Sequence, residues 1–299
     1  MFADWLSIPS AYLRSRASLA YAAKRNGPGM EFAQFGKVLA RRMIARGNFR
    51  VGLTYLLTPV NIVRYFEFPF ALSCLAEGLG DCLDVASPRL FSLFAARKHP
   101  TASIRVINPD PRDLSCTARA AKSLRLNNIF TECVAVERLK YTACQYQSIW
   151  SISVVEHIAG ETADTDAMCT LYKALEPGGR LIVTVPVDRK FWLEYRRTDL
   201  YGTQGTARDG QFFFARHYDR AAVFQRLVDP LGVQASVIRW FGEKTPGRFA
   251  SHDRRWQTQG FRCTADDARE IVDNYTEFAD WSLMPGQGVC GLMIEKVSN

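Results

Sequence analysis

From residue 81 onward, short apolar stretches alternate with stretches of helical periodicity, and this alternation restricts the possible folds more than any other feature. Seven stretches have the character of strands, at residues 81–86, 103–107, 130–135, 147–152, 180–186, 233–240 and 288–296. Helix-compatible stretches separate the early ones, at residues 89–98, 112–125 and 162–175. Such alternation is typical of a parallel sheet covered by helices. We therefore predict an α/β fold with a doubly wound, mostly parallel, seven-stranded sheet.

The two ends of the chain depart from this alternation. Residues 241–287 form a long irregular segment with one helix-compatible stretch at 264–280, and the strand after it is expected to add in the antiparallel direction. Apolar residues recur at helical spacing from Phe32 to Arg46, and a second helical run precedes residue 81. We therefore predict a helical N-terminal extension over residues 1–70. An α/β domain follows over residues 71–299, with an insertion at about 187–220.

A polar elbow follows the first predicted strand, in the sequence "CLDVASPRL" at residues 82–90. Doubly wound sheets bind ligands beyond the carboxyl ends of their strands, where the strand order reverses. Asp84 and Ser87 occupy that position after the first strand, whereas Asn108 and Asp110 follow the second, where they can accept hydrogen bonds from a ribose diol. Taken alone, the elbow is equally well explained as a buried strand followed by a helix cap.

Two further motifs accompany the elbow. "YQSIWSISVVEHIAG" at residues 146–160 predicts a buried strand that ends in a polar turn, and "LYKALEPGGRLIVTVPV" at residues 171–187 predicts a helix, a tight turn and a strand. In this order and spacing, the three segments resemble the class I S-adenosylmethionine-dependent methyltransferases over roughly residues 75–240. "GVCGLMIEK" near the end resembles the last strand of that family. The resemblance implies a Rossmann-like methyltransferase fold, S-adenosylmethionine as cofactor, and methyl transfer as the reaction.

The first motif departs from the family pattern Asp-x-Gly-x-Gly-x-Gly, because Ala86, Pro88 and Leu90 stand in place of its glycines. Glycine permits positive φ and close approach of the backbone to a ligand. Pro88 fixes its own φ and lacks an amide donor, so the elbow is expected to be stiffer. Ser87 as N-cap and Pro88 in the first turn would make the elbow a helix start.

The acidic positions of the family are also shifted. The acid of the second strand aligns with Asn108, with Asp110 two residues further on, and the acid of the third motif aligns with Ala135, with Glu137 as the nearest carboxylate. Carried over position by position, the resemblance implies a set of cofactor-binding residues on four successive strand ends. That set consists of Asp84, Ala86, Ser87, Asn108, Asp110, Glu137 and Ser153.

The candidate catalytic residues are His157 and Glu156, which follow the fourth predicted strand. A hydroxyl acceptor needs a base, and histidine titrates in a suitable range. Glu156 would orient the imidazole or cap the helix, and a structural histidine that caps a helix fits the sequence equally well. Since adjacent residues point in different directions, only one of the two is expected to face a pocket. The eight cysteines and four histidines show no ligand-like spacing, so we expect no metal site.

Substrate contacts are expected from the N-terminal extension and from the insertion, which is rich in arginine and aromatic residues such as Tyr195, Arg196 and Arg216. Arginine forks and flat rings suit sugars, phosphates or nucleotides. We expect methyl transfer to a small-molecule or glycan-like acceptor. One alternative is a catalytically inactive, methyltransferase-like binding or regulatory protein, which the missing glycines favour. Another is an RNA- or membrane-associated methyltransferase that uses the basic N-terminus.

Charge is concentrated at the N-terminus. Of the net charge of +8, residues 1–60 contribute +7, from nine Lys or Arg against two acidic residues. Such a patch favours a phosphate, nucleic acid or membrane surface, with a solvated helix face as the alternative. No separate nucleic-acid-binding motif is evident, so we do not expect nucleic acid as a partner. Peripheral contact with a membrane or another anionic partner through this patch stays open beside the solvated helix face, which is the slightly favoured interpretation. Scattered single cysteines suggest reduced thiols in a cytoplasmic protein. The sequence does not indicate an oligomeric state.

Overall fold

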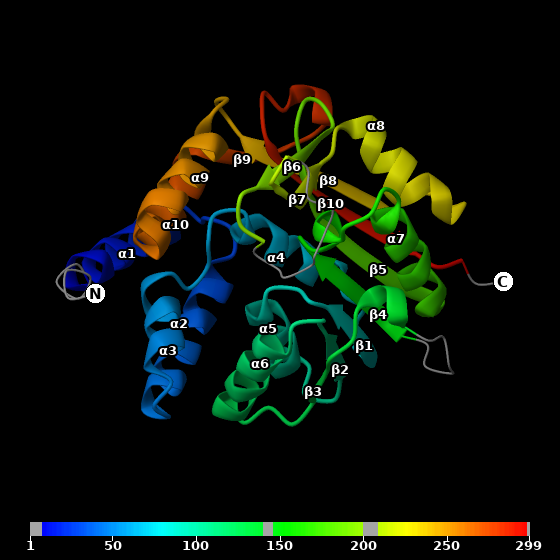
Figure 1. The fold of residues 1–299 in the computed structure, drawn as a ribbon. Coiled ribbons are helices and arrows are strands. Elements are labelled where there is room, and N and C mark those ends of the chain that lie inside the picture. The colour runs from blue at the N-terminus through cyan, green and yellow to red at the C-terminus, as the bar shows by residue number, and fades with distance from the viewer. Residues whose placement is uncertain (1–7, 140–145, 200–208, 298–299) are drawn as a thin grey trace.

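The computed structural model describes residues 8–139, 146–199 and 209–297 (Figure 1). An eight-stranded sheet with the order β3-β2-β1-β4-β5-β10-β8-β9 forms its centre. The strands are β1 (Asp81–Val85), β2 (Ser103–Ile107), β3 (Ile129–Glu132), β4 (Tyr146–Ile152), β5 (Leu175–Val187), β8 (Val237–Glu243), β9 (Tyr275–Phe278) and β10 (Gly288–Glu295). Strands β1 to β5 pair in parallel, whereas β10 is antiparallel to both of its neighbours. The predicted doubly wound, mostly parallel α/β sheet is therefore confirmed.

All seven predicted strands are present, and β9 adds an eighth. Residues 264–280, predicted as a single helix, form instead the end of a 3-10 helix (Gly260–Asp266), then α10 (Asp267–Asn274) and then β9. The helix prediction is wrong at its C-terminal end because Tyr275 turns into extended backbone and pairs with Glu243 on the outer side of β8. Strand pairing at a sheet edge is a long-range contact, which local helical periodicity does not reveal.

Helices cover both faces of the sheet. One face carries α4 (Arg64–Cys74), α5 (Arg89–Lys98) and α6 (Pro111–Leu124), with Phe68, Phe91 and Trp150 in its core. The other carries α7 (Ala163–Ala174) and the helical segment that starts at α8 (Arg220–Ala222), with Met168 and Leu171 in its core. Successive strand side chains point to opposite faces, so both layers are filled from the same strands.

The N-terminal helices are α1 (Ile8–Ala23), α2 (Met30–Ala45) and α3 (Phe49–Leu57). Helix α1 lies beside α10, and α9 (Arg248–Gln259) lies above α10 in Figure 1. The Tyr21 hydroxyl donates to Asp273 Oδ1 at 2.7 Å, and the Arg269 amide donates to Ser18 Oγ at 2.8 Å. The N-terminal extension therefore packs against residues from the far end of the chain.

The expected insertion at about 187–220 contains a separate two-stranded hairpin, β6 (Trp192–Arg196) and β7 (Phe212–His217). An isolated bridge between Val187 and Tyr218 ties the base of this hairpin to the end of β5. Among the described helices, none combines the length and the apolar character that crossing a membrane requires.

Candidate cofactor and substrate site

Two left-handed turns stand where the strand order reverses, between β1 and β4. Ala86, directly after β1, has φ of 49°, and its amide donates to Ile107 O at 2.8 Å. Ser153, directly after β4, has φ of 50°, and its amide donates to Thr184 O at 3.0 Å. Residues other than glycine rarely adopt a positive φ, and such strained positions cluster at functional sites. Ala86 thus keeps a glycine-like turn although it carries a methyl group.

Asp84 lies fully buried beneath the elbow. Its Oδ1 accepts a hydrogen bond from the Ser87 amide at 2.9 Å, and its Oδ2 accepts one from the Ser92 hydroxyl. Burial raises the pKa of this carboxyl to about 6, while the hydrogen bonds from Ser92 and Ser87 oppose the rise. Asp84 was predicted to contact the cofactor. In the structure its carboxylate stabilises the elbow through hydrogen bonds.

Ser87 is also buried, and its Oγ accepts a hydrogen bond from the Ile152 amide at 3.0 Å. The prediction that Ser87 caps α5 is wrong, because the N-cap position is occupied by Pro88, without a side-chain cap. The Ser87 hydroxyl is instead committed to β4, since the fold brings the ends of these two strands together. Ser87 therefore joins the two turns at the switch point.

The remaining predicted cofactor residues lie on the outer strand ends. Asn108 Oδ1 accepts from the Asp110 amide at 2.8 Å, and Asp110 Oδ1 caps α6 by accepting from the Arg112 amide at 2.8 Å. Asp110 is exposed at the surface. Glu137 is exposed in the short 3-10 helix Val136–Arg138, which packs against α7. No hydrogen bond or ion pair of the described residues joins Glu137 to the elbow.

A buried hydrogen-bond network that was not predicted joins α4 to the carboxyl ends of β4 and β5. Glu67 on α4 is fully buried, and its Oε1 accepts from Ser153 Oγ at 2.6 Å and from Thr184 Oγ1 at 2.8 Å. Arg64, one turn earlier, forms an ion pair with Glu67 and donates to Ser153 Oγ at 2.7 Å. The signal in the sequence is an Arg and a Glu spaced i, i+3 within the otherwise apolar "NIVRYFEFPF".

Glu156 and His157 follow Ser153 and point in different directions. Glu156 is buried, and its Oε2 has no hydrogen-bond partner among the described residues. Burial, with a smaller contribution from the nearby Glu67 carboxylate, raises the pKa of Glu156 to about 8. His157 is partly exposed, and burial lowers its pKa to about 4. Both side chains are therefore largely uncharged at neutral pH.

The tautomer of His157 follows from its hydrogen bond. The Nδ1 atom lies 2.6 Å from Phe214 O, and a carbonyl only accepts, so Nδ1 carries the proton. The basic lone pair is then on Nε2, which lies 3.7 Å from Glu156 Oε1. The fixed orientation suits a proton acceptor, whereas the pKa of about 4 is below the range near neutrality that the sequence led us to expect, because the ring is buried.

The insertion mainly stabilises its own hairpin and the turn after β4. Arg216 is buried, donates to Ile158 O at 2.7 Å and to Gly160 O, and pairs with Asp164 at 3.5 Å. The expectation that Arg216 contacts substrate is therefore corrected, because its guanidinium is satisfied inside the protein. The Arg196 guanidinium lies 3.4 Å from the centroid of the Phe214 ring.

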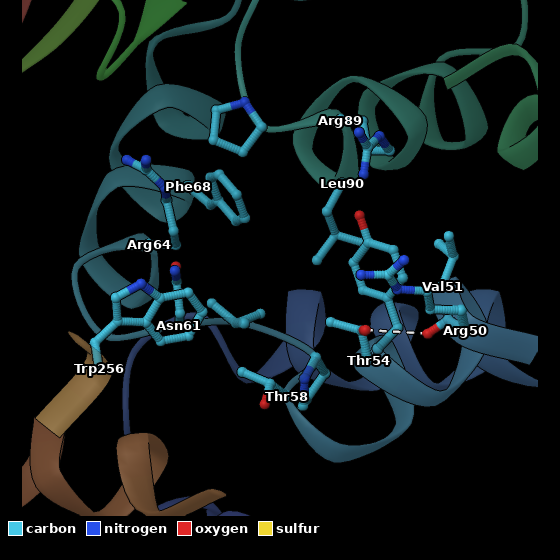
Figure 2. A pocket seen from close by; sticks show the side chains of 14 residues that line it. Arg50, Val51, Thr54, Thr58, Asn61, Arg64, Phe68, Arg89, Leu90 and Trp256 are labelled. Carbon is cyan, nitrogen blue, oxygen red and sulfur yellow. Dashed lines mark hydrogen bonds between the residues drawn. The ribbon is translucent and has the colours of Figure 1, made fainter. Parts of the chain in front are cut away.

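A cavity of about 320 Å³ lies beside the elbow, between α3, α4 and the start of α5. Figure 2 shows the side chains that line it. This volume is within the range of small-molecule sites, roughly 300–1,000 Å³. Its lining consists of Arg50, Val51, Thr54, Tyr55, Thr58, Pro59, Val60, Asn61, Arg64, Phe68, Pro88, Arg89, Leu90 and Trp256. None of the nine predicted site residues is in this lining. The cavity adjoins them through Pro88, which follows Ser87, and through Arg64, which binds Ser153.

No protein-family profile matches the chain, and no curated protein sequence matches it significantly. Many solved structures share its fold. The crystal structure of coclaurine N-methyltransferase bound to N-methylheliamine and S-adenosylhomocysteine has a TM-score of 0.50 at 10% identity, over 76% of this chain and 68% of that chain. Geranyl diphosphate C-methyltransferase from Streptomyces coelicolor A3(2) has a TM-score of 0.48 at 11% identity, over 77% of this chain and 76% of that chain. The [4+2]-cyclase SpnF has a TM-score of 0.47 at 16% identity, over 78% and 80%.

The sheet order and the first of these likenesses agree on the fold. The chain has the Rossmann-like fold of class I methyltransferases, with an additional edge strand and N-terminal helices. At this level of identity the likeness establishes the fold alone, because one fold hosts many activities.

Proposed function

We propose that the protein transfers a methyl group from S-adenosylmethionine to a small-molecule acceptor. The observation that carries this proposal is the pair of left-handed turns at Ala86 and Ser153, side by side at the switch point of a methyltransferase fold. Such strain persists only where surrounding structure holds it, and here Asp84, Ser87 and Thr184 supply the bonds that do so. The elbow therefore retains its shape without glycine.

The residues at the strand ends suit the cofactor in chemical terms. The exposed Asp110 can accept hydrogen bonds from a ribose diol, and the backbone of Ala86 and the turn at Ser153 border the same sheet edge. Arg64 and Glu67 would lie over the inner end of the site. When bound, S-adenosylmethionine supplies an electrophilic methyl group.

His157 is the proposed base. Its Nδ1–H is engaged by Phe214 O, so Nε2 can take a proton from a hydroxyl or ammonium acceptor. Glu156 does not orient the imidazole through a hydrogen bond, because its Oε1 lies 3.7 Å from Nε2; in this scheme it is the buried, largely uncharged side chain beside the base. The imidazolium then releases the proton to solvent, to which the side chain is partly exposed.

One observation favours a second candidate, a methyltransferase-like protein that binds a ligand without catalysis. Asp84, Ser87, Asn108 and Glu67 all use their polar atoms in bonds within the protein. A site that is satisfied internally gains less from binding a polar cofactor.

Calorimetric titration of the full chain with S-adenosylmethionine and S-adenosylhomocysteine tests the proposal. We expect binding of both, together with transfer of label from methyl-labelled S-adenosylmethionine to acceptors in a small-molecule panel. If the protein binds S-adenosylmethionine but transfers label to none of the acceptor classes, the result supports the second candidate. The absence of both binding heat and a thermal shift at millimolar ligand would overturn both candidate functions.

We also propose a reducing compartment such as the cytoplasm. Seven cysteines in the described part of the chain are free thiols, and four of them are buried. Disulfides rarely form where thiols are kept reduced.

A further inference from the structure

The cavity beside the elbow has a strongly asymmetric charge. Three arginines line it, namely Arg50 on α3, Arg64 on α4 and Arg89 at the start of α5, and its lining contains neither aspartate nor glutamate. The first residues of α5 also face it, which adds the positive end of a helix dipole. The cavity is therefore built to attract an anion.

Two of these arginines form ion pairs with carboxylates that do not line the cavity. Arg64 pairs with Glu67, and Arg89 pairs with Asp113, both carboxylates lying outside the lining. Arg89 Nε also donates to Thr117 Oγ1 at 3.4 Å. Arg50, by contrast, has no carboxylate partner in the described part of the chain. The nearest charges thus leave a net of one uncompensated positive charge, which matches a carboxylate or a phosphate.

The rest of the lining is mostly apolar or aromatic, with Thr54, Thr58 and Asn61 as its uncharged polar residues. Tyr55 and Phe68 lie in its wall, and the indole of Trp256, which is 43% exposed, stands at the opposite end of the lining from Arg89 in Figure 2. Aromatic faces of this kind pack against planar or apolar groups. A ligand with an anionic head and an apolar or aromatic body would satisfy both parts.

We propose that this cavity binds the methyl acceptor, and that the acceptor is a small organic anion with a carboxylate or phosphate head held by Arg50 and an apolar or aromatic body beside Trp256. This inference rests on the proposed function. Its position supports it, because Arg64 bridges the cavity to Ser153, and Glu156 and His157 follow Ser153 in the chain.

The test is a calorimetric titration of the full chain with three probes of similar size, phenyl phosphate, benzoate and benzyl alcohol. The two anions distinguish a phosphate from a carboxylate head, and the alcohol is the neutral control. We expect at least one anion to bind about ten-fold or more tighter than benzyl alcohol. Equal affinity for all three probes would overturn the inference.

Two variants separate the cavity from general surface charge. Arg50→Gln should weaken binding of the preferred anion by about five- to ten-fold, because it removes the uncompensated charge. The matched control Arg42→Gln removes the same charge from an exposed position on α2 and should change affinity by less than about two-fold. Equal losses in both variants would show nonspecific attraction and overturn the inference.

Repeating the titration with saturating S-adenosylhomocysteine distinguishes acceptor from cofactor. We expect the anion to bind alongside it, whereas mutual displacement would show that the cavity belongs to the cofactor and would overturn the acceptor assignment. The protein could also bind the anion through Arg50 without binding S-adenosylhomocysteine. That result would overturn the methyltransferase proposal and the acceptor role, but it would support an anion-binding cavity.

Discussion

The Nε1–H of Trp150 on β4 donates a hydrogen bond to Ser92 Oγ on α5 at 2.9 Å, and Ser92 in turn donates to the carboxylate of Asp84. All three side chains are fully buried. This chain of bonds ties two neighbouring strands and one helix together directly beneath the elbow.

Replacing Ser92 by alanine should therefore destabilise the fold. The change leaves a buried indole N–H and one oxygen of Asp84 without partners, which costs roughly 2–4 kcal/mol in the free energy of unfolding. Ser115→Ala, at an exposed position on α6, is the matched control and should cost less than about 0.5 kcal/mol. Urea unfolding of the three proteins measures both values, and equal stability of the two variants would contradict the proposed role of Ser92.

Ala86→Gly should stabilise the protein, against the usual direction of an alanine-to-glycine change. Glycine relieves the cost of the left-handed backbone at φ of 49°, so we expect a gain of roughly 0.5–1 kcal/mol in the free energy of unfolding. Ala118→Gly, exposed within α6, should lose about 1 kcal/mol. A loss at both positions would show that residue 86 is not left-handed in solution.

Glu156→Gln should change how stability depends on pH. A carboxyl whose pKa is raised to about 8 by burial binds its proton more tightly in the folded state, so its contribution to stability is complete below about pH 4.5 and declines until about pH 8. The slope is at most about 1.4 kcal/mol per pH unit. The glutamine variant lacks this term, so its melting temperature relative to the native protein should rise between pH 5 and 8. A constant difference over that range would refute the raised pKa.

If His157 is the base, activity should persist at unusually low pH. Because burial lowers the pKa of His157 to about 4, its neutral, proton-accepting form prevails from pH 5 upward. We expect the His157-dependent part of kcat to show no inflection between pH 5.5 and 7.5, and His157→Ala to lower kcat by roughly 10²–10⁴-fold. An inflection near pH 6.5 that disappears in His157→Ala would contradict the buried, neutral imidazole.

Much of the fold follows from local patterns. The strands after residue 81 and helices such as 89–98 are visible in the sequence because burial on a sheet and on a helix imposes different periodicities on neighbouring residues. The elbow at Asp84 to Pro88 and the turn after β4 were also predicted, since turns need particular residues at particular positions. The edge strand β9 was missed, because its pairing partner lies about thirty residues away.

Periodicity and turn residues thus predicted the sheet and most of its flanking helices, and they pointed to the carboxyl ends of the strands as the place for a ligand. What the polar side chains at those strand ends do depends instead on contacts between elements that are distant in the chain. Asp84 holds the elbow, Glu67 closes the strand ends, and Arg50 faces a cavity formed by helices from both ends of the chain. The physical reason is that periodicity records whether a side chain is buried, whereas the partner of a buried polar group depends on which distant elements the fold brings against it.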